Sequence, residues 1–340
     1  MIKFFKAAGN AATERLSEYE KGCWIDLINP TDDEVDDVCA LTGLPEEMIK
    51  AALDEEETAR CERDDDAFLC LLDTPTITET DDGDSYGTLP VALIHNPNCI
   101  VTVSLRGNPV LGDFISNRVA IDTTQPVLFM LTFMMGNAKR FLAGLRQIDK
   151  KSLRVQAELH RSMKNKEIIQ MLELENSLVY FSTSLSANMA VYHKMGRMSA
   201  ITENEEYQDL YDDVVIETRQ AVEMCTVYRD ILAGTMDSCA SIISNNMNIV
   251  MKLLTVVTLI ISIPTLIASI WGMNVDVPFG TGFTGGFWIV IAICIVATVV
   301  SAFFLIRSTN SIKIKTAHPK RKQPRAPHDS IKQSKKKSGK

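Results

Sequence analysis

The 340-residue sequence lacks the motifs by which most enzymes and secreted proteins are recognised. Its eight cysteines include no CxxC pair, which argues against a disulfide framework and against a structural zinc site. Its five histidines are dispersed, and GxSxG, Walker and HExxH motifs are absent. We therefore expect neither an enzyme nor an organic cofactor, and we place most of the chain in a reducing compartment.

Proline is missing between Pro126 and Pro264, although seven of the 12 prolines fall between Pro30 and Pro126. Because proline interrupts helices, this gap indicates long helices, and its content of Leu, Met, Ala, Glu and Lys agrees. The sequence predicts helices over residues 126–151 and 164–195, and a third of about 68 residues from about Glu203. We interpret residues 126–252 as a helical stalk.

Charge is missing from two long stretches near the C-terminus. Residues 253–270 are 18 uncharged residues, 287–306 are 20 more, and the segment between them carries only Asp276. A helix needs about 20 apolar residues to cross a bilayer. The sequence therefore predicts a transmembrane hairpin over residues 253–306, with spans at 253–271 and 287–306 and an outer loop at 272–286.

Basic residues follow the second predicted span. The 34 residues after Ile306 hold 12 Lys and Arg against one acid, Asp329, so the net charge of −8 leaves −19 on residues 1–306. Since cytoplasmic flanks hold the excess of Lys and Arg, we expect a multi-pass protein of the cell membrane with both termini in the cytoplasm. The basic tail, residues 307–340, is expected to lie against anionic lipid headgroups, and we expect no nucleic-acid partner.

Residues 1–125 alternate short apolar runs with helix signals. The runs at 23–29, 67–73, 89–96 and 99–105 are typical of strands. Thr31 and Glu34 form a capping box, Gly43 ends that helix, and Pro45 begins the next. We expect a small cytosolic α/β domain whose sheet is packed by helices.

Hydroxyl side chains recur along the first predicted span. Thr255, Thr258, Ser262, Thr265 and Ser269 are separated by 3, 4, 3 and 4 residues, and the series extends backward to Met251 and Asn248. Single Ser and Thr residues commonly bond their own i−4 carbonyls. Five on one helix face favour instead a face shared by several identical helices around water, since two spans per chain cannot enclose a conduit alone.

The segment NNMNIVMKLLTVVTLIISIPTLIASIWGMN resembles the first transmembrane helix of the CorA family of magnesium transporters, whose signature is Gly-Met-Asn, here Gly272, Met273 and Asn274. The resemblance covers the chain up to its basic tail. It implies an α+β membrane protein in which an N-terminal cytosolic α/β domain, a long helical stalk and two C-terminal transmembrane helices form a funnel-shaped homopentamer. It further implies a channel that passes hydrated Mg²⁺ down its electrochemical gradient.

The resemblance also implies roles for individual residues. Gly272, Met273 and Asn274 would form the outer selectivity ring, and Asp276 would attract cations at the outer mouth. Together with the hydroxyl stripe, the implied pore lining is Asn248, Met251, Thr255, Thr258, Ser262, Thr265 and Ser269. Regulatory Mg²⁺, bound between subunits, is expected at carboxylates among Asp209, Asp212, Asp213 and Asp73.

Two alternatives stay open at this point. Related branches of the superfamily carry zinc, cobalt or nickel, so Mg²⁺ is the first expectation and Co²⁺, Ni²⁺ and Zn²⁺ are the others. A membrane-anchored coiled-coil receptor or scaffold without transport would also have a stalk and two anchoring spans. The hydroxyl stripe discriminates between the two classes, because an anchor needs no polar lining.

Overall fold

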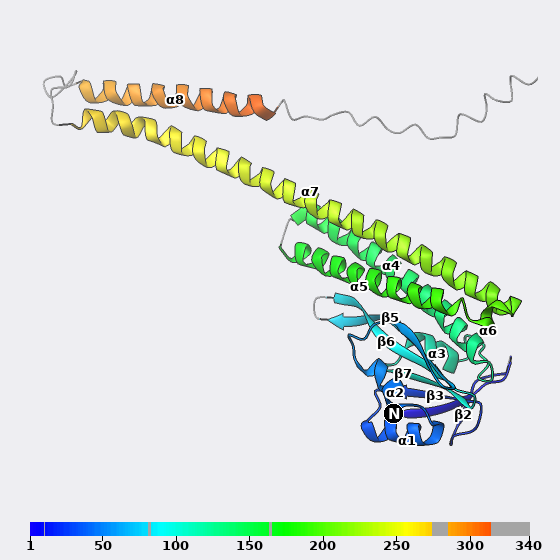
Figure 1. Cartoon of the computed structure of the whole chain (residues 1–340). Helices are drawn as coiled ribbons and strands as arrows, with labels where there is room; N and C mark the ends of the chain where they lie inside the picture. The colour runs from blue at the N-terminus through cyan, green and yellow to red at the C-terminus, as the bar shows by residue number, and fades with distance from the viewer. Residues whose placement is uncertain (10, 81–82, 163–164, 274–284, 314–340) are drawn as a thin grey trace, which may run out of the picture. The chain divides into compact units, whose positions relative to one another are not determined.

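The computed structural model of the chain describes residues 1–313 except 10, 81–82, 163–164 and 274–284 (Figure 1). The chain divides into two compact units between Cys239 and Ala240. The helix α7 (Glu205–Trp271) crosses this division. The predicted end of the α/β domain at residue 125 and the predicted end of the stalk at residue 252 stay predictions.

The first unit is built on a seven-stranded mixed sheet with the strand order β2-β1-β3-β7-β6-β5-β4. Its strands are β1 (Ile2–Lys6), β2 (Glu14–Leu16), β3 (Cys23–Ile28), β4 (Arg60–Asp64), β5 (Ala67–Thr80), β6 (Gly83–His95) and β7 (Cys99–Ser104). Strands β3 and β7 pair in parallel, whereas the other neighbouring strands pair antiparallel.

The four predicted strands are confirmed as β3, β5, β6 and β7, but the prediction missed three others. Strands β5 and β6 run to 14 and 13 residues, beyond the apolar runs that revealed them. Strands β1, β2 and β4 lie toward the sheet edges and carry charged residues, and only Cys61 of β4 is buried. Edge strands commonly carry charged side chains, which discourage pairing with another chain, so their apolar signal is weak.

One face of the sheet is covered by α1 (Asp32–Thr42), α2 (Glu46–Lys50) and a 3₁₀ turn (Ala51–Leu53). The predicted capping box is confirmed: the Glu34 N–H donates to Thr31 Oγ1 at 3.3 Å, and the Thr31 N–H donates to Glu34 Oε2 at 3.1 Å. Gly43 ends α1 with a φ of 72°, a conformation that favours glycine. Val38 and Ile49 of these helices belong to the same buried core as Leu71 of the sheet.

The other face is covered by α3 (Pro109–Ile115), α4 (Pro126–Ser162), α5 (Asn165–Met195), α6 (Ser199–Thr202) and the start of α7 (Figure 1). Trp24 of β3 is buried in the core on this face, with its ring centroid 5.0 Å from that of Phe5 and 5.4 Å from that of Phe129. Farther along, α4, α5 and α7 form a separate core in which Phe141 packs edge-on against Phe181. The unit is therefore a sheet between two helical layers, extended by a three-helix bundle.

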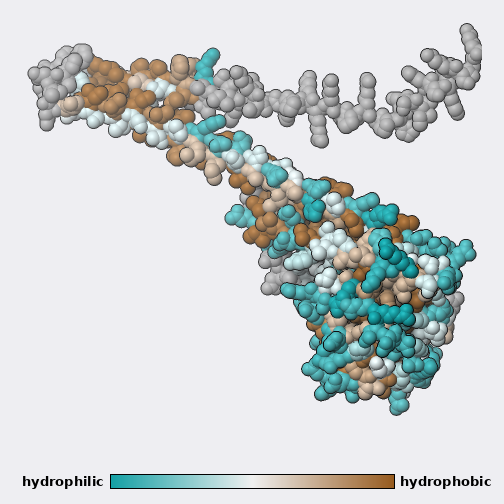
Figure 2. All heavy atoms as spheres, viewed as in Figure 1, coloured by the Kyte–Doolittle hydropathy of each residue, from teal (hydrophilic) through white to brown (hydrophobic). Residues whose placement is uncertain are grey.

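The long third helix is confirmed: α7 has 67 residues against about 68 predicted. It and α8 (Gly286–Lys313) contain apolar stretches long enough to cross a membrane, at the positions of the two predicted spans. Figure 2 shows hydrophobic residues gathered over this part of α7 and over α8. The second unit is thus a pair of apolar helices.

Two buried asparagines fix the helical layer to the sheet at Asp73 of β5. The Asp73 N–H donates to Asn188 Oδ1 at 2.9 Å, and its carbonyl accepts from Asn188 Nδ2 at 2.8 Å. Asn137 Nδ2 of α4 donates to the same carbonyl at 2.8 Å. One backbone unit of β5 is thereby held by both α4 and α5.

We predict that Asn188→Ala lowers the free energy of unfolding by about 2–3 kcal/mol, because it leaves the Asp73 N–H without its partner and removes one of the two donors to the Asp73 carbonyl. The matched control is Asn176→Ala, which removes an exposed asparagine from the same helix. Thermal unfolding of the detergent-solubilised protein, followed by tryptophan fluorescence, measures both. Equal melting temperatures for the two variants would contradict the assigned role.

Candidate ion pathway

The C-terminal part of α7 places the predicted hydroxyl stripe on one exposed face. In the described chain, all seven side chains predicted to line a pore are exposed: Asn248, Met251, Thr255, Thr258, Ser262, Thr265 and Ser269. Their spacing of three and four residues is preserved because α7 is an α-helix throughout this stretch. The structure therefore brings these seven positions into one stripe along a single chain.

Four hydroxyls of the stripe donate to backbone carbonyls one turn earlier. Thr255 bonds Met251 O at 2.8 Å, Thr258 bonds Leu254 O at 2.8 Å, Ser262 bonds Thr258 O at 2.7 Å, and Thr265 bonds Ile261 O at 2.8 Å. Each proton is thus used inside the helix, and the oxygen lone pairs remain available as acceptors. Thr298 and Ser301 of α8 make the same bond, so the bond alone does not identify a pathway.

The opposite face of α7 is the one that packs against α8. Its half-buried residues between 253 and 271 are Val256, Ile260, Ile263, Pro264, Ile267 and Trp271. At 100° per residue, this set and the hydroxyl stripe are centred about 170° apart on the helix. Figure 1 shows α8 beside the end of α7, and Figure 2 shows pale residues, the colour of Ser and Thr, along the edge of α7 away from α8.

The Gly-Met-Asn segment begins where α7 ends. The Gly272 N–H donates to Ala268 O at 2.9 Å, the Met273 N–H donates to Ile270 O at 3.3 Å, and the Met273 side chain is 56% exposed. Gly272 and Met273 thus extend the last turn of the helix. Asn274 and Asp276 lie outside the described residues, so their predicted roles stay predictions.

The predicted regulatory carboxylates are not assembled by a single chain. Asp209, Asp212 and Asp213 are exposed near the start of α7, whereas Asp73 is a half-buried residue of β5 that is bonded to α4 and α5. Burial raises the pKa of Asp73, and a hydrogen bond from Ser184 opposes that rise. Within the described residues, no three His, Cys, Asp or Glu side chains are arranged to hold a metal ion. A site between subunits stays a prediction.

Sequence reasoning missed the two asparagines that hold Asp73, Asn137 and Asn188. Both are almost fully buried, at 0% and 1% exposure. A signal was present, because each occupies a core position of an otherwise apolar helix face, where a polar side chain requires a partner. What the sequence did not reveal was that both amides bond the same backbone unit of β5.

Comparison with known proteins adds the decisive observation. The family described as CorA-like Mg²⁺ transporter protein matches residues 19–307 of the chain. The protein belongs to the CorA family. Members of this family are transporters, so the chain is a membrane transport protein and not an enzyme.

Individual CorA proteins are similar over nearly the whole chain. The cobalt/magnesium transport protein CorA of Methanocaldococcus jannaschii is 27% identical over 293 residues, which cover 84% of this chain and 90% of the relative. The complete structure of the CorA magnesium transporter from that organism matches with a TM-score of 0.75 at 24% identity, over 90% of this chain and 96% of the other. The full-length CmaX protein matches with a TM-score of 0.67 at 15% identity and the same coverage. These structures confirm the fold of the CorA family.

The exposed face of α7 can be tested in lipid at Thr258, with Thr298 of α8 as the control position. We predict that Thr258→Cys reacts with a water-soluble, membrane-impermeant thiol reagent in proteoliposomes, because its face is left open by α8. Thr298→Cys, half-buried on α8, should react no more than the wild type. Mass spectrometry of the labelled protein measures both, and protection of Thr258→Cys by lipid would contradict a water-facing stripe.

Proposed function

We propose that several copies of this CorA-family protein surround a pore lined by α7 and pass divalent cations down their electrochemical gradient. Mg²⁺ is the first candidate and Co²⁺ the second, since the family is described by Mg²⁺ and the M. jannaschii relative by cobalt and magnesium. Ni²⁺ and Zn²⁺ are the remaining alternatives. Mg²⁺ is both the transported ion and the proposed regulator, and no organic cofactor takes part.

The position of the hydroxyl stripe, on an exposed face of α7, carries this proposal, and the hydrogen bonding of the stripe fits a hydrated ion. Mg²⁺ gives up its water reluctantly, so a hydrated ion presents water protons to its surroundings. Four hydroxyls of the stripe donate their protons to carbonyls of the helix backbone: Thr255, Thr258, Ser262 and Thr265. On the exposed side of the stripe, these hydroxyls therefore offer oxygen atoms that accept hydrogen bonds. A lining of neutral acceptors suits hydrated cations, and it holds them less tightly than carboxylates would.

An oligomer is needed because one α7 cannot enclose water. The proposed assembly is a homopentamer in which the stripes of five chains face a common axis. Apolar residues exposed on the α7 stalk, among them Ile216, Val227 and Ile231, support self-association, since they are more than half exposed in the single chain. The proposed topology places both termini in the cytoplasm of the cell membrane, with the basic tail against anionic headgroups.

The outer end of the proposed pore is the Gly-Met-Asn segment. A ring of Asn274 amide oxygens and Gly272 carbonyls would accept hydrogen bonds from the waters of the entering ion. Asp276 would raise the local cation concentration at the mouth. Conduction would then depend on the ion keeping its water shell at this ring.

We predict that Asn274→Ala and Thr258→Val each lower Mg²⁺ flux by about tenfold or more, because each removes a ring of acceptors for a hydrated ion. Proteoliposomes loaded with a Mg²⁺-sensitive dye and given a Mg²⁺ gradient measure the flux. The matched control is Thr298→Val, which removes the same kind of hydroxyl from α8 and should leave the flux unchanged.

Each outcome of this assay decides between the classes of function. A wild-type protein that conducts no Mg²⁺, Co²⁺, Ni²⁺ or Zn²⁺ would favour the scaffold without transport. Equal flux in the wild type and both variants would contradict the assignment of Thr258 and Asn274 to the ion pathway. Faster flux of Zn²⁺ than of Mg²⁺ would support the proposed pathway but identify Zn²⁺ as the transported ion.

The proposed sensor consists of carboxylates that repel one another between subunits until Mg²⁺ binds. We predict that millimolar Mg²⁺ slows proteolysis of the α/β domain in the wild type, but not after Asp209, Asp212 and Asp213 are changed to Asn. Changing the exposed Asp36 and Asp37 of α1 to Asn should leave the protection intact. Cleavage of the wild type at one rate with and without Mg²⁺ would eliminate this sensor.

A further inference from the structure

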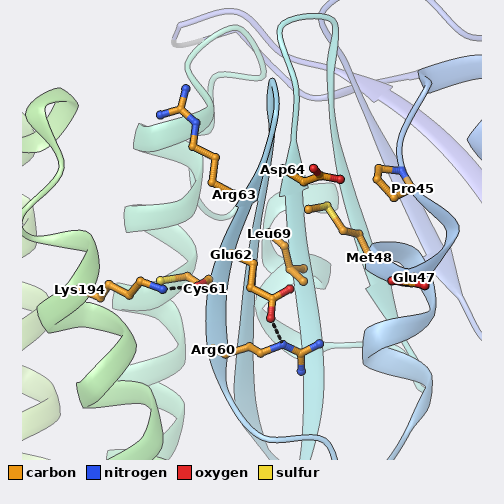
Figure 3. Close-up of a pocket in the computed structure, with 10 residues that line it drawn as sticks. All are labelled: Pro45, Glu47, Met48, Arg60, Cys61, Glu62, Arg63, Asp64, Leu69 and Lys194. Atoms are coloured by element: carbon orange, nitrogen blue, oxygen red, sulfur yellow. Dashed lines mark hydrogen bonds and ion pairs between the residues drawn. The ribbon is translucent and has the colours of Figure 1, made fainter.

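A pocket surrounds the edge strand β4, remote in sequence from the hydroxyl stripe. Its volume is about 540 Å³, and its lining comes from α2, β4, β5 and the end of α5 (Figure 3). Lys194 of α5 reaches to β4, where Nζ donates to the Cys61 carbonyl at 2.6 Å. Cys61 itself lines the pocket and is 4% exposed. The pocket therefore extends to one cysteine of the sheet.

Three sulfur-containing side chains belong to one core cluster at this point. Cys61 is directly opposite Cys70 in the antiparallel β4–β5 pair, so both side chains project from the same face of the sheet. Both belong to the core beneath α5. The Cys70 thiol lies 3.6 Å from the thioether sulfur of Met195, the residue after Lys194. Two thiols and one thioether thus come from three elements, and one of the two cysteines, Cys61, lines the pocket.

We propose that Cys61, Cys70 and Met195 form a binding site for the soft monovalent metal ion Cu(I). Thiolate and thioether ligands select Cu(I) among the metals available to proteins, and a three-sulfur environment satisfies it. The site is separate from the proposed ion pathway, whose ligands are oxygens. Its function would be to sense or hold a soft metal at the edge of the sheet.

The charges of the site balance when Cu(I) is bound. Each thiol loses one proton to solvent and forms one S–Cu bond, while Met195 donates a lone pair without a change in charge. Two thiolates and Cu(I) carry a net charge of −1. The Lys194 ammonium group beside Cys61 supplies the compensating +1. No electron transfer is required, because the metal enters and stays as Cu(I).

Other ions fit the three sulfurs less well. A structural zinc site takes four ligands, usually Cys and His, and the described residues contain no group of three or more His, Cys, Asp or Glu side chains suited to a metal. Mg²⁺ and Ca²⁺ require oxygen ligands. Burial raises the pKa of both thiols, more strongly at Cys70, so Cu(I) must displace protons and should bind more tightly as pH rises.

The test is a Cu(I) titration of the full-length, reduced protein in detergent under anaerobic conditions, with bathocuproine disulfonate as the competing chelator. We expect the wild type to bind one Cu(I) per chain more tightly than Cys61→Ala does. Met195→Leu keeps both thiols and the core volume, and it should weaken binding by about tenfold or more. The matched control, Cys99→Ala, removes one thiol of the other directly opposed pair, Cys23 and Cys99, and should bind as the wild type does.

Two results would overturn the site. One is equal affinity in the wild type, Cys61→Ala and Met195→Leu. The other is a Cys61–Cys70 disulfide, detected by mass spectrometry of the non-reduced protein, that forms in place of metal binding. Should Cys61→Ala fail to fold by circular dichroism, X-ray absorption of the wild-type Cu(I) complex decides, because three sulfur neighbours support the site and fewer reject it.

Discussion

The arrangement of the two apolar helices depends on the hydrogen bonds that the hydroxyl side chains of α7 make among apolar residues. A hydroxyl in such a setting requires a hydrogen-bond partner, and four hydroxyls of α7 find it in carbonyls of their own helix. The helix therefore needs no second element on that face. This leaves α8 free to pack against the opposite, fully apolar face, and the hydroxyl oxygens stay exposed in the single chain.

The features that the sequence predicted well are those encoded locally. The capping box at Thr31 and Glu34, the end of α1 at Gly43 and the long α7 each follow from residues a few positions apart or from the absence of proline. The exposed hydroxyl face could likewise be derived from spacing alone. Membership in the CorA family confirms the resemblance that was based on the segment ending in Gly-Met-Asn.

The features that the sequence did not reveal depend on contacts between distant segments. Strand β4 has the sequence RCERD, which shows no apolar alternation, because Cys61 alone is buried. The pairing of Cys61 with Cys70 requires the β4–β5 register, and the approach of Met195 requires α5 to lie across that strand. In the same way, Asn137 and Asn188 could be recognised as buried amides, but their common partner on β5 follows only from the fold.

Ligand chemistry keeps the two proposed sites independent within one chain. Hydroxyl, amide and carbonyl oxygens along α7 suit hard cations such as Mg²⁺, which bind sulfur poorly and retain their water. The sulfurs of Cys61, Cys70 and Met195 suit soft ions, which gain little from neutral hydroxyls. A hard ion in the pathway therefore does not compete for the sulfur site, and a soft ion at β4 does not obstruct the pathway. Any effect of Cu(I) on transport would have to pass through the conformation of the α/β domain, since the two ligand sets exclude direct competition.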